Sequence, residues 1–159
     1  ISFRLDYYTV EELAKIVERS AEILGVGIDH DSAIEVASRS RGTPRLANRL
    51  LKRVRDYAQV RADGTITWQV ASEAMTFFEI DELGLDWMDV KILTALCSTF
   101  RGRAVGLSTV ASAVGEDAST IEDVYEPYLL QRGLIIRTPQ GRRATPGAFE
   151  HLGMEVPAD

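Results

Sequence analysis

The sequence predicts a mainly α-helical protein of two small domains, the second of which ends in a short β-hairpin. Three observations support this class. Apolar residues recur at helical spacing through most of the chain. An acidic stretch at residues 79–86, with Gly84 inside it, divides the chain into two halves. The sequence Pro139-Gln140-Gly141 forms a tight turn between two short extended runs. With 159 residues and 45% hydrophobic composition, the chain can bury one ordinary core or two small ones.

Four helices are expected in the first half. The clearest starts are the capping box at residues 9–12 and the pair Thr43-Pro44, where Thr caps the helix and Pro takes its first position. Gly25 supplies the end of the first helix. The expected segments are 9–24, a helix starting near Asp29 or Asp31 and ending at the break 40–42, 43 to about 58, and a helix that follows 65–67 and continues through Ala74.

The second half predicts helices followed by the hairpin. The expected order is a helix at 87–99, an extended segment at 105–107, helices at 108–114 and from about 118–120 to 131, and strands at 134–138 and 142–145. This order is typical of a winged helix, which is a helix-turn-helix variant with a β-ribbon appended. Trp68 and Trp87, each at the start of a helix, are expected to be core or domain-interface residues.

Composition excludes several classes of protein. The formal net charge of −6 argues against non-specific coating of nucleic acid. The two histidines, His30 and His151, are too isolated to suggest a zinc site, so no metal site is expected. The sequence has no glycine-rich phosphate-binding loop. It has no apolar run of about 20 residues, so no membrane partner is expected. A lone Cys97 in an apolar run suggests a cytoplasmic protein, and the start at Ile1 suggests a piece of a longer one.

Basic residues concentrate in two stretches. Residues 39–61 carry eight basic side chains against Asp56 alone, and residues 127–149 carry four arginines and no acid. On a helical wheel the third helix separates these charges from its apolar residues. The basic face holds Arg45, Arg49, Lys52 and Arg53, and the opposite face holds Leu46, Leu50, Leu51, Val54, Tyr57 and Ala58.

Arg45 differs from the other basic residues of this helix by its position. A solvated surface explains Arg49, Lys52 and Arg53. Arg45 lies in the first turn, where the helix dipole disfavours a cation and favours a bound anion. Its place there makes sense if a phosphate approaches.

Residues 41–56 resemble the second nucleotide-sensing motif of AAA+ ATPases, in the form found in the RuvB family of bacterial Holliday-junction branch-migration motors. The resemblance covers essentially the whole chain, because further stretches match that family at the same spacings. These are Asp6-Tyr7-Tyr8 and residues 63–66, 123–129 and 137–142. The resemblance implies three parts: the end of the large ATPase domain at 1–9, the small helical lid domain at 10–80, and the winged-helix head at 81–159.

The same resemblance implies roles for particular residues and partners. Tyr8 would pack against the adenine, Arg45 would contact the ATP phosphates, and Arg137 and Arg142 would contact DNA. The parent would be a homo-hexameric, ATP-dependent DNA helicase that acts on duplex DNA at Holliday junctions in recombination and repair. Its missing N-terminal half would hold Mg²⁺ with the ATP and bind RuvA. Without that half, this chain should be inactive alone.

The helix expected before the hairpin indicates how the head would bind DNA. Its expected faces are apolar (Ile121, Val124, Tyr125, Tyr128 and Leu129) and acidic and exposed (Glu122, Asp123 and Glu126). Phosphates would repel the acidic face, and Pro127 interrupts the helix, so insertion into the major groove is disfavoured.

The basic groups of the head lie on the hairpin instead. Arg137, Arg142 and Arg143 flank the tight turn, in positions suited to backbone or minor-groove contact without base reading. Surface solvation is the preferred interpretation for Arg143 and Arg132, and also for Arg101 and Arg103 on their loop. The alternative function is a stand-alone winged-helix transcription regulator or protein-interaction module, which the acidic helix disfavours.

Overall fold

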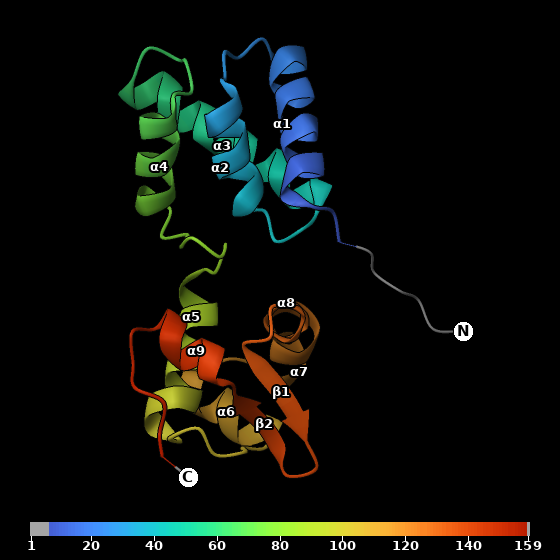
Figure 1. Ribbon diagram of the computed structural model, residues 1–159, viewed down its shortest axis with the longest axis vertical. Coiled ribbons are helices and arrows are strands. Elements are labelled where there is room, and N and C mark those ends of the chain that lie inside the picture. The colour runs from blue at the N-terminus through green and yellow to red at the C-terminus, as the bar shows by residue number, and fades with distance from the viewer. Residues whose placement is uncertain (1–6, 159) are drawn as a thin grey trace, which may run out of the picture. The chain divides into compact units, whose positions relative to one another are not determined.

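The chain divides into two compact units between Asp86 and Trp87 (Figure 1). The computed structural model describes residues 7–158. The expectation for the start of the chain, Asp6 included, therefore lies largely outside the described residues. Within the described range, no helix is both long enough and apolar enough to cross a membrane.

Four helices build the first unit, and each begins at a side chain that caps it. The helices are α1 (Val10–Leu24), α2 (His30–Ser38), α3 (Pro44–Arg61) and α4 (Trp68–Phe77). The capping oxygens, which accept from backbone N–H groups of the first turn, belong to Thr9, Asp29, Thr43 and Thr67. The four predicted helices are confirmed, although α3 continues three residues beyond the expected end at Ala58.

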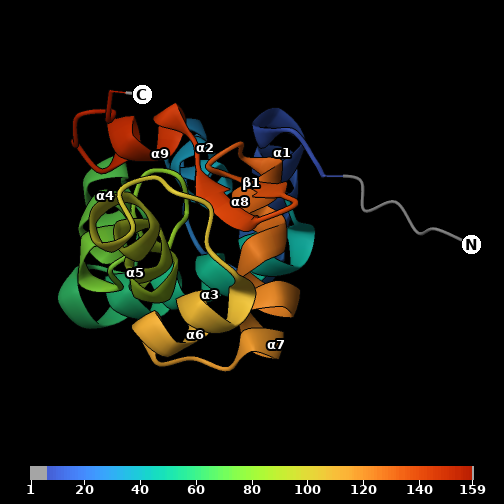
Figure 2. The ribbon, with the colours of Figure 1, turned by 90° about the horizontal axis from the view of Figure 1, so that it is seen from below.

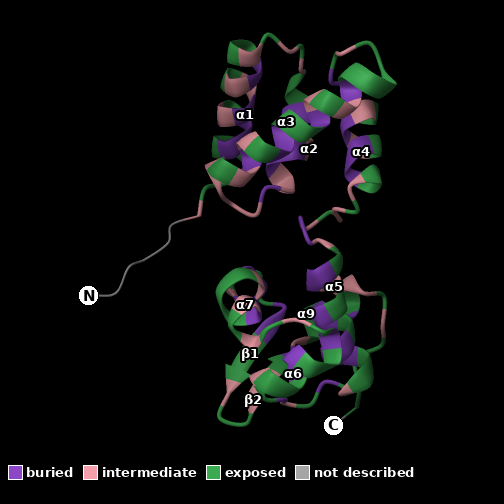
Figure 3. Ribbon diagram, turned by 180° about the vertical axis from the view of Figure 1, so that it is seen from behind, coloured by how far each residue is buried: buried purple, intermediate pink, exposed green. Residues whose placement is uncertain are grey.

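Small and branched apolar residues form the core of this unit. Figure 3 shows the buried residues on the inward sides of the four helices. The core includes Leu13, Val17, Val36, Leu50, Leu51, Val54, Ile66 and Met75. Ile66 also forms a parallel bridge with Ile28, which ties the loop after α1 to the loop before α4.

The second unit has the winged-helix order that the sequence predicts. Its elements are α5 (Trp87–Thr94), the π-helical turn η1 (Ala95–Thr99), α6 (Leu107–Val114), α7 (Ala118–Thr120), the π-helical turn η2 (Ile121–Tyr125), α8 (Glu126–Gln131), β1 (Ile135–Thr138), β2 (Gly141–Ala144) and α9 (Pro146–His151). Seen from below, α6 and α7 lie on one side of the unit and α9 on the opposite side (Figure 2). The final helix α9 was not expected from the sequence.

Strands β1 and β2 form an antiparallel hairpin in which Arg137 is paired with Arg142. A third segment extends this ribbon, because Val105 and Arg142 exchange two backbone hydrogen bonds of 2.7 and 2.8 Å. The hairpin, hereafter the wing, is therefore fixed to the loop that follows η1.

The helix expected over 118–131 is interrupted, and this changes which residues face the core. The π-helical turn η2 occupies Ile121–Tyr125, and Pro127 is the second residue of α8. A π-helical turn holds more residues than an α-helical turn. The residues after it are therefore rotated around the helix axis relative to a regular helical wheel. The predicted faces are therefore wrong at two positions: Glu126 is only 1% exposed, whereas Val124 is exposed.

The two tryptophans are not core residues. Trp68 is 54% exposed and Trp87 is 60% exposed, each as the first residue of its helix. The Trp87 ring lies 5.5 Å from the Nζ atom of Lys91, one helical turn later. Amphipathic rings at helix starts can cover the helix surface instead of entering the core.

Candidate functional site

The N-terminal end of α3 presents Arg45 to solvent. Thr43 accepts a hydrogen bond of 3.2 Å from the N–H of Leu46, and Pro44 takes the first helical position. The predicted amphipathic faces are confirmed, because Arg45, Arg49, Lys52 and Arg53 are exposed while Leu50, Leu51, Val54 and Ala58 are buried. Among the described residues, none forms an ion pair with Arg45. Its guanidinium therefore keeps its hydrogen-bond donors available beside the first turn of the helix.

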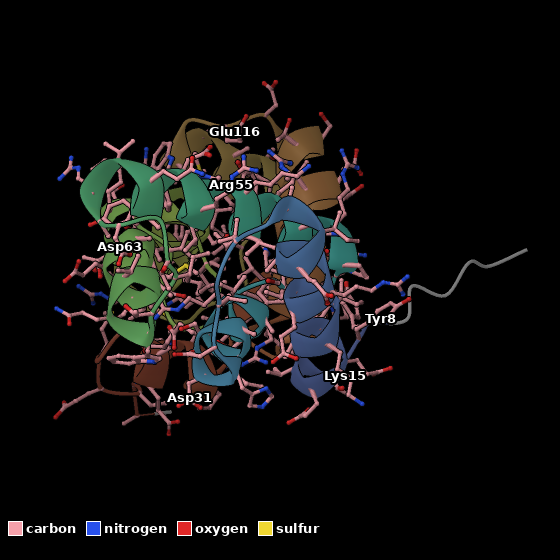
Figure 4. All side chains as sticks on the ribbon, turned by 90° about the horizontal axis from the view of Figure 1, so that it is seen from above. Tyr8, Lys15, Asp31, Arg55, Asp63 and Glu116 are labelled. Atoms are coloured by element: carbon pink, nitrogen blue, oxygen red, sulfur yellow. The ribbon has the colours of Figure 1, made fainter. Side chains whose placement is uncertain are left out.

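The loop before α3 brings Tyr8 to the same end of this helix. The N–H of Tyr8 donates a hydrogen bond of 2.9 Å to the carbonyl oxygen of Gly42. Gly42 has a φ of +74°, and a Cβ there would lie 2.8 Å from Cδ1 of Tyr7. Glycine is thus required both by the backbone conformation and by the tyrosine packed on it. In Figure 4, Tyr8 and Asp63 mark opposite ends of α3.

Tyr8 and Arg45 are the two residues that the family resemblance assigns to a nucleotide. The structure joins their segments through Gly42, and the side chain of Tyr8 is exposed. An exposed aromatic ring can stack on a planar group, and a guanidinium without an ion-pair partner in the described chain can bind an anion. Within residues 7–158 no three His, Cys, Asp or Glu side chains form a group that could hold a metal ion.

In the second unit, both wing arginines that the sequence assigns to DNA bind one buried carboxylate. Nε of Arg137 donates to Oε1 of Glu126 at 2.6 Å, and its Nη2 pairs with the same oxygen. Nε of Arg142 donates to Oε2 of Glu126 at 2.8 Å, and its Nη2 reaches Oε1 at 3.2 Å. The same Nη2 also reaches Glu122 at 3.2 Å. These contacts clamp the wing to η2 and α8.

The clamp leaves the two guanidiniums differently exposed. The side chain of Arg142 is 18% exposed and that of Arg137 is 52% exposed. The hydrogen bonds that Arg142 donates to Glu126 raise the pKa of Arg142 further above its ordinary value. Both guanidiniums use Nε and Nη2 for Glu126, and neither uses Nη1 in a hydrogen bond or ion pair within the described chain.

The clamp was missed at the sequence level for a local reason. Cross-strand pairing of Arg137 with Arg142 places both on one face of the hairpin, and the turn sequence alone could have suggested that. A regular helical wheel places their partner Glu126 on the exposed face, because the wheel does not include the π turn. The remaining predicted surface arginines, Arg132 and Arg143, are exposed as expected.

Comparison with known proteins relates both units to one family. Residues 8–81 match the model of the RuvB AAA lid domain, and residues 82–153 match the model of the RuvB C-terminal winged helix domain. The two models together span nearly all of the described chain.

Solved structures of Thermotoga maritima RuvB agree with these matches. The structure described as the RuvB Holliday junction branch migration motor is 47% identical, covers 96% of this chain and superposes with a TM-score of 0.89. Two single-residue mutants of that protein give 46% and 47% identity over 97% and 96% of this chain, with TM-scores of 0.91 and 0.90. This chain spans 51% of the length of each of them. The chain belongs to the RuvB family, of which it carries the lid domain and the C-terminal winged-helix domain.

Proposed function

We propose that this chain is the nucleotide-sensing lid and DNA-contacting head of an ATP-driven motor that moves Holliday junctions in recombination and repair. The observation that supports this most strongly is the 47% identity to a branch-migration motor over 96% of the chain, with both domains in the same order. The proposed motor is a cytoplasmic homo-hexamer. The part of the motor outside this chain would hold Mg²⁺ with the ATP, hydrolyse the ATP and bind RuvA.

In the lid, Arg45 would report the state of the nucleotide. The apolar face of α3 is anchored in the core by Leu50, Leu51 and Val54, which fixes the direction of the helix. A guanidinium in the first turn of an anchored helix can follow the ATP phosphates only if the whole lid moves with it. Loss of the terminal phosphate would then release the lid. The covalent connection between the two units would transmit the rotation of the lid to the head. Tyr8 would stack on the adenine at the same end of α3.

In the head, the wing would bind the phosphate backbone of duplex DNA. Arg137 and Arg142 would donate their Nη1 groups to phosphates while Glu126 holds their other edges. Backbone contacts position a protein without reading sequence, as a motor that advances along DNA requires. The exposed acids Glu122 and Asp123 would keep the preceding helical turn away from the phosphates.

A fusion protein tests the proposal. We would join this chain to the ATPase half of Thermotoga maritima RuvB and measure ATP-driven migration of a synthetic Holliday junction with RuvA present. We expect migration that the ATPase half alone does not perform. A fusion that hydrolyses ATP and assembles normally, yet never moves a junction, would contradict the proposal.

Duplex competition separates a motor from a transcription regulator. We expect random and designed duplexes to compete equally for the chain, because a motor needs no specificity ratio. Arg137→Ala and Arg142→Ala should weaken binding to every duplex alike. A preference among sequences that either substitution alters would instead indicate base reading.

A further inference from the structure

A second group of arginines gathers on the head, separate from the Glu126 clamp. Arg101 and Arg103 on the loop after η1 and Arg143 on β2 line one hollow of about 660 Å³. We call these three residues the arginine patch. Only Gly102 separates Arg101 from Arg103 in the sequence, whereas Arg143 comes from a strand about 40 residues later. The fold, and not the local sequence, brings the patch together.

The loop of the patch is held rigidly. Gly102 is buried with a φ of +76°, and a Cβ there would lie 3.1 Å from Cζ of Phe149. Its N–H donates to the carbonyl oxygen of Leu96 at 2.9 Å, and the N–H of Arg103 donates to Phe100 at 3.0 Å. The backbone beneath both arginines is therefore packed on the core, which limits the entropy lost when their side chains bind a ligand.

Strand alternation directs Arg143 away from the clamp. Successive side chains of a strand point to opposite faces, so Arg142 and Arg143 cannot share one. Arg142 faces Glu126, whereas Arg143 is exposed and lines the hollow. Val105 pairs with Arg142 two residues after Arg103, so the patch is continuous with the wing.

The patch carries net positive charge that the clamp lacks. Two arginines of the clamp face two carboxylates, Glu126 and Glu122. By contrast, none of the three patch arginines forms an ion pair within residues 7–158, and no Asp or Glu of that range lines the hollow. Counterion release, which dominates affinity for DNA, depends on charge that the protein has not already neutralised.

We propose that the arginine patch is a binding site for the phosphate backbone of duplex DNA, adjoining the wing. This inference rests on the proposed function of the head and adds the residues that supply its net charge. Each guanidinium can donate two parallel hydrogen bonds to one phosphate, and all three side chains line the same hollow. Because only the backbone is contacted, the patch raises affinity without adding sequence preference.

The test measures binding of the full chain to a fluorescent duplex of random sequence by anisotropy, from 0.05 to 0.2 M salt. The patch variant is Arg101→Gln with Arg103→Gln and Arg143→Gln. The charge-matched control removes three exposed basic residues of the first unit, by Arg19→Gln, Arg49→Gln and Lys52→Gln. A third variant changes the three patch arginines to Lys, which keeps the charge. Thermal melts establish that all variants fold.

Three lost phosphate contacts should reduce the slope of log affinity against log salt by about 2.7. We expect the patch variant to bind about tenfold or more weakly at low salt and the control to change less than about twofold. The Lys variant should lie between them, because it keeps the charge but loses the paired hydrogen bonds. Equal losses in the patch variant and the control would overturn the inference and leave the proposed DNA contact of the head intact. A wild-type chain without salt-sensitive binding to duplex DNA would overturn both.

Discussion

Replacing Glu126 by Gln should destabilise the second unit more than the removal of any single charge of the wing. The substitution keeps the size of the side chain but removes the charge that two guanidiniums share in a site only 1% exposed. Removing one partner of a fully buried ion pair typically costs about 3–5 kcal/mol. Here Arg137 is half exposed and can turn to water, so we expect a smaller loss of about 2–3 kcal/mol.

Urea unfolding of the full chain, followed by backbone amide NMR, measures this loss in one unit at a time. Signals of Ile92 and Leu129 report the second unit, and the signal of Leu51 in the first unit is an internal reference. For a domain of this size, the expected loss corresponds to a melting temperature lower by roughly 8–24 °C.

Glu122→Gln is the matched control. It makes the same chemical change one helical turn earlier, at a carboxylate that is 49% exposed and contacts Arg142 alone at 3.2 Å. Exposed pairs of this kind contribute about 0–1 kcal/mol. If Glu126→Gln cost no more than Glu122→Gln, the clamp would not hold the wing and our account of the head would be refuted.

Three further predictions concern the first unit. Gly42→Ala should lower the free energy of unfolding by about 1–3 kcal/mol, because its positive φ and the Tyr7 ring both oppose a Cβ. Urea unfolding of the double variant with Tyr7→Ala should recover only the part of this loss that comes from the clash with the ring. Asp29→Ala should lower the free energy of unfolding by about 1 kcal/mol, because α2 loses its N-terminal cap. An unchanged free energy of unfolding would contradict the capping role of Asp29. The hydrogen bond that the His30 ring donates to Glu18 raises the pKa of His30 above its ordinary value. The stabilisation from this pair is therefore complete below the pKa of His30 in the unfolded chain and disappears as pH rises through its pKa in the folded chain. The melting temperature of wild type minus that of His30→Asn should therefore be larger at pH 5.5 than at pH 8.5, and equal differences would contradict the pairing.

Features set by neighbouring residues could be predicted from the sequence. The capping oxygens of Thr9 and Thr43 act within three residues of their own position, so their motifs locate helix starts reliably. The basic and apolar faces of α3 follow from a regular period of 3.6 residues, which that helix keeps over its whole length.

Features that depend on an irregular turn or on distant packing could not be predicted. The π turn η2 shifts the helical period, so a regular helical wheel places Glu126 on the exposed face and does not predict the clamp. The patch depends on Arg143 meeting a loop about 40 residues earlier, which no local pattern records. The short helix α9 has only six residues and no side-chain cap, so its sequence carries little helical signal.

The nucleotide-sensing role of Arg45 is the central claim, and the rate of ATP hydrolysis by the complete motor tests it most directly. Arg45→Ala and Arg49→Ala each remove one exposed arginine from the same face of α3, one turn apart, so both change the general charge equally. A charged hydrogen bond to a phosphate contributes about 1.5–3 kcal/mol, which corresponds to a loss of roughly tenfold to a hundredfold in rate. We predict that loss for Arg45→Ala and less than about a twofold change for Arg49→Ala. Equal hydrolysis rates for the two variants, at equal melting temperatures, would contradict the claim.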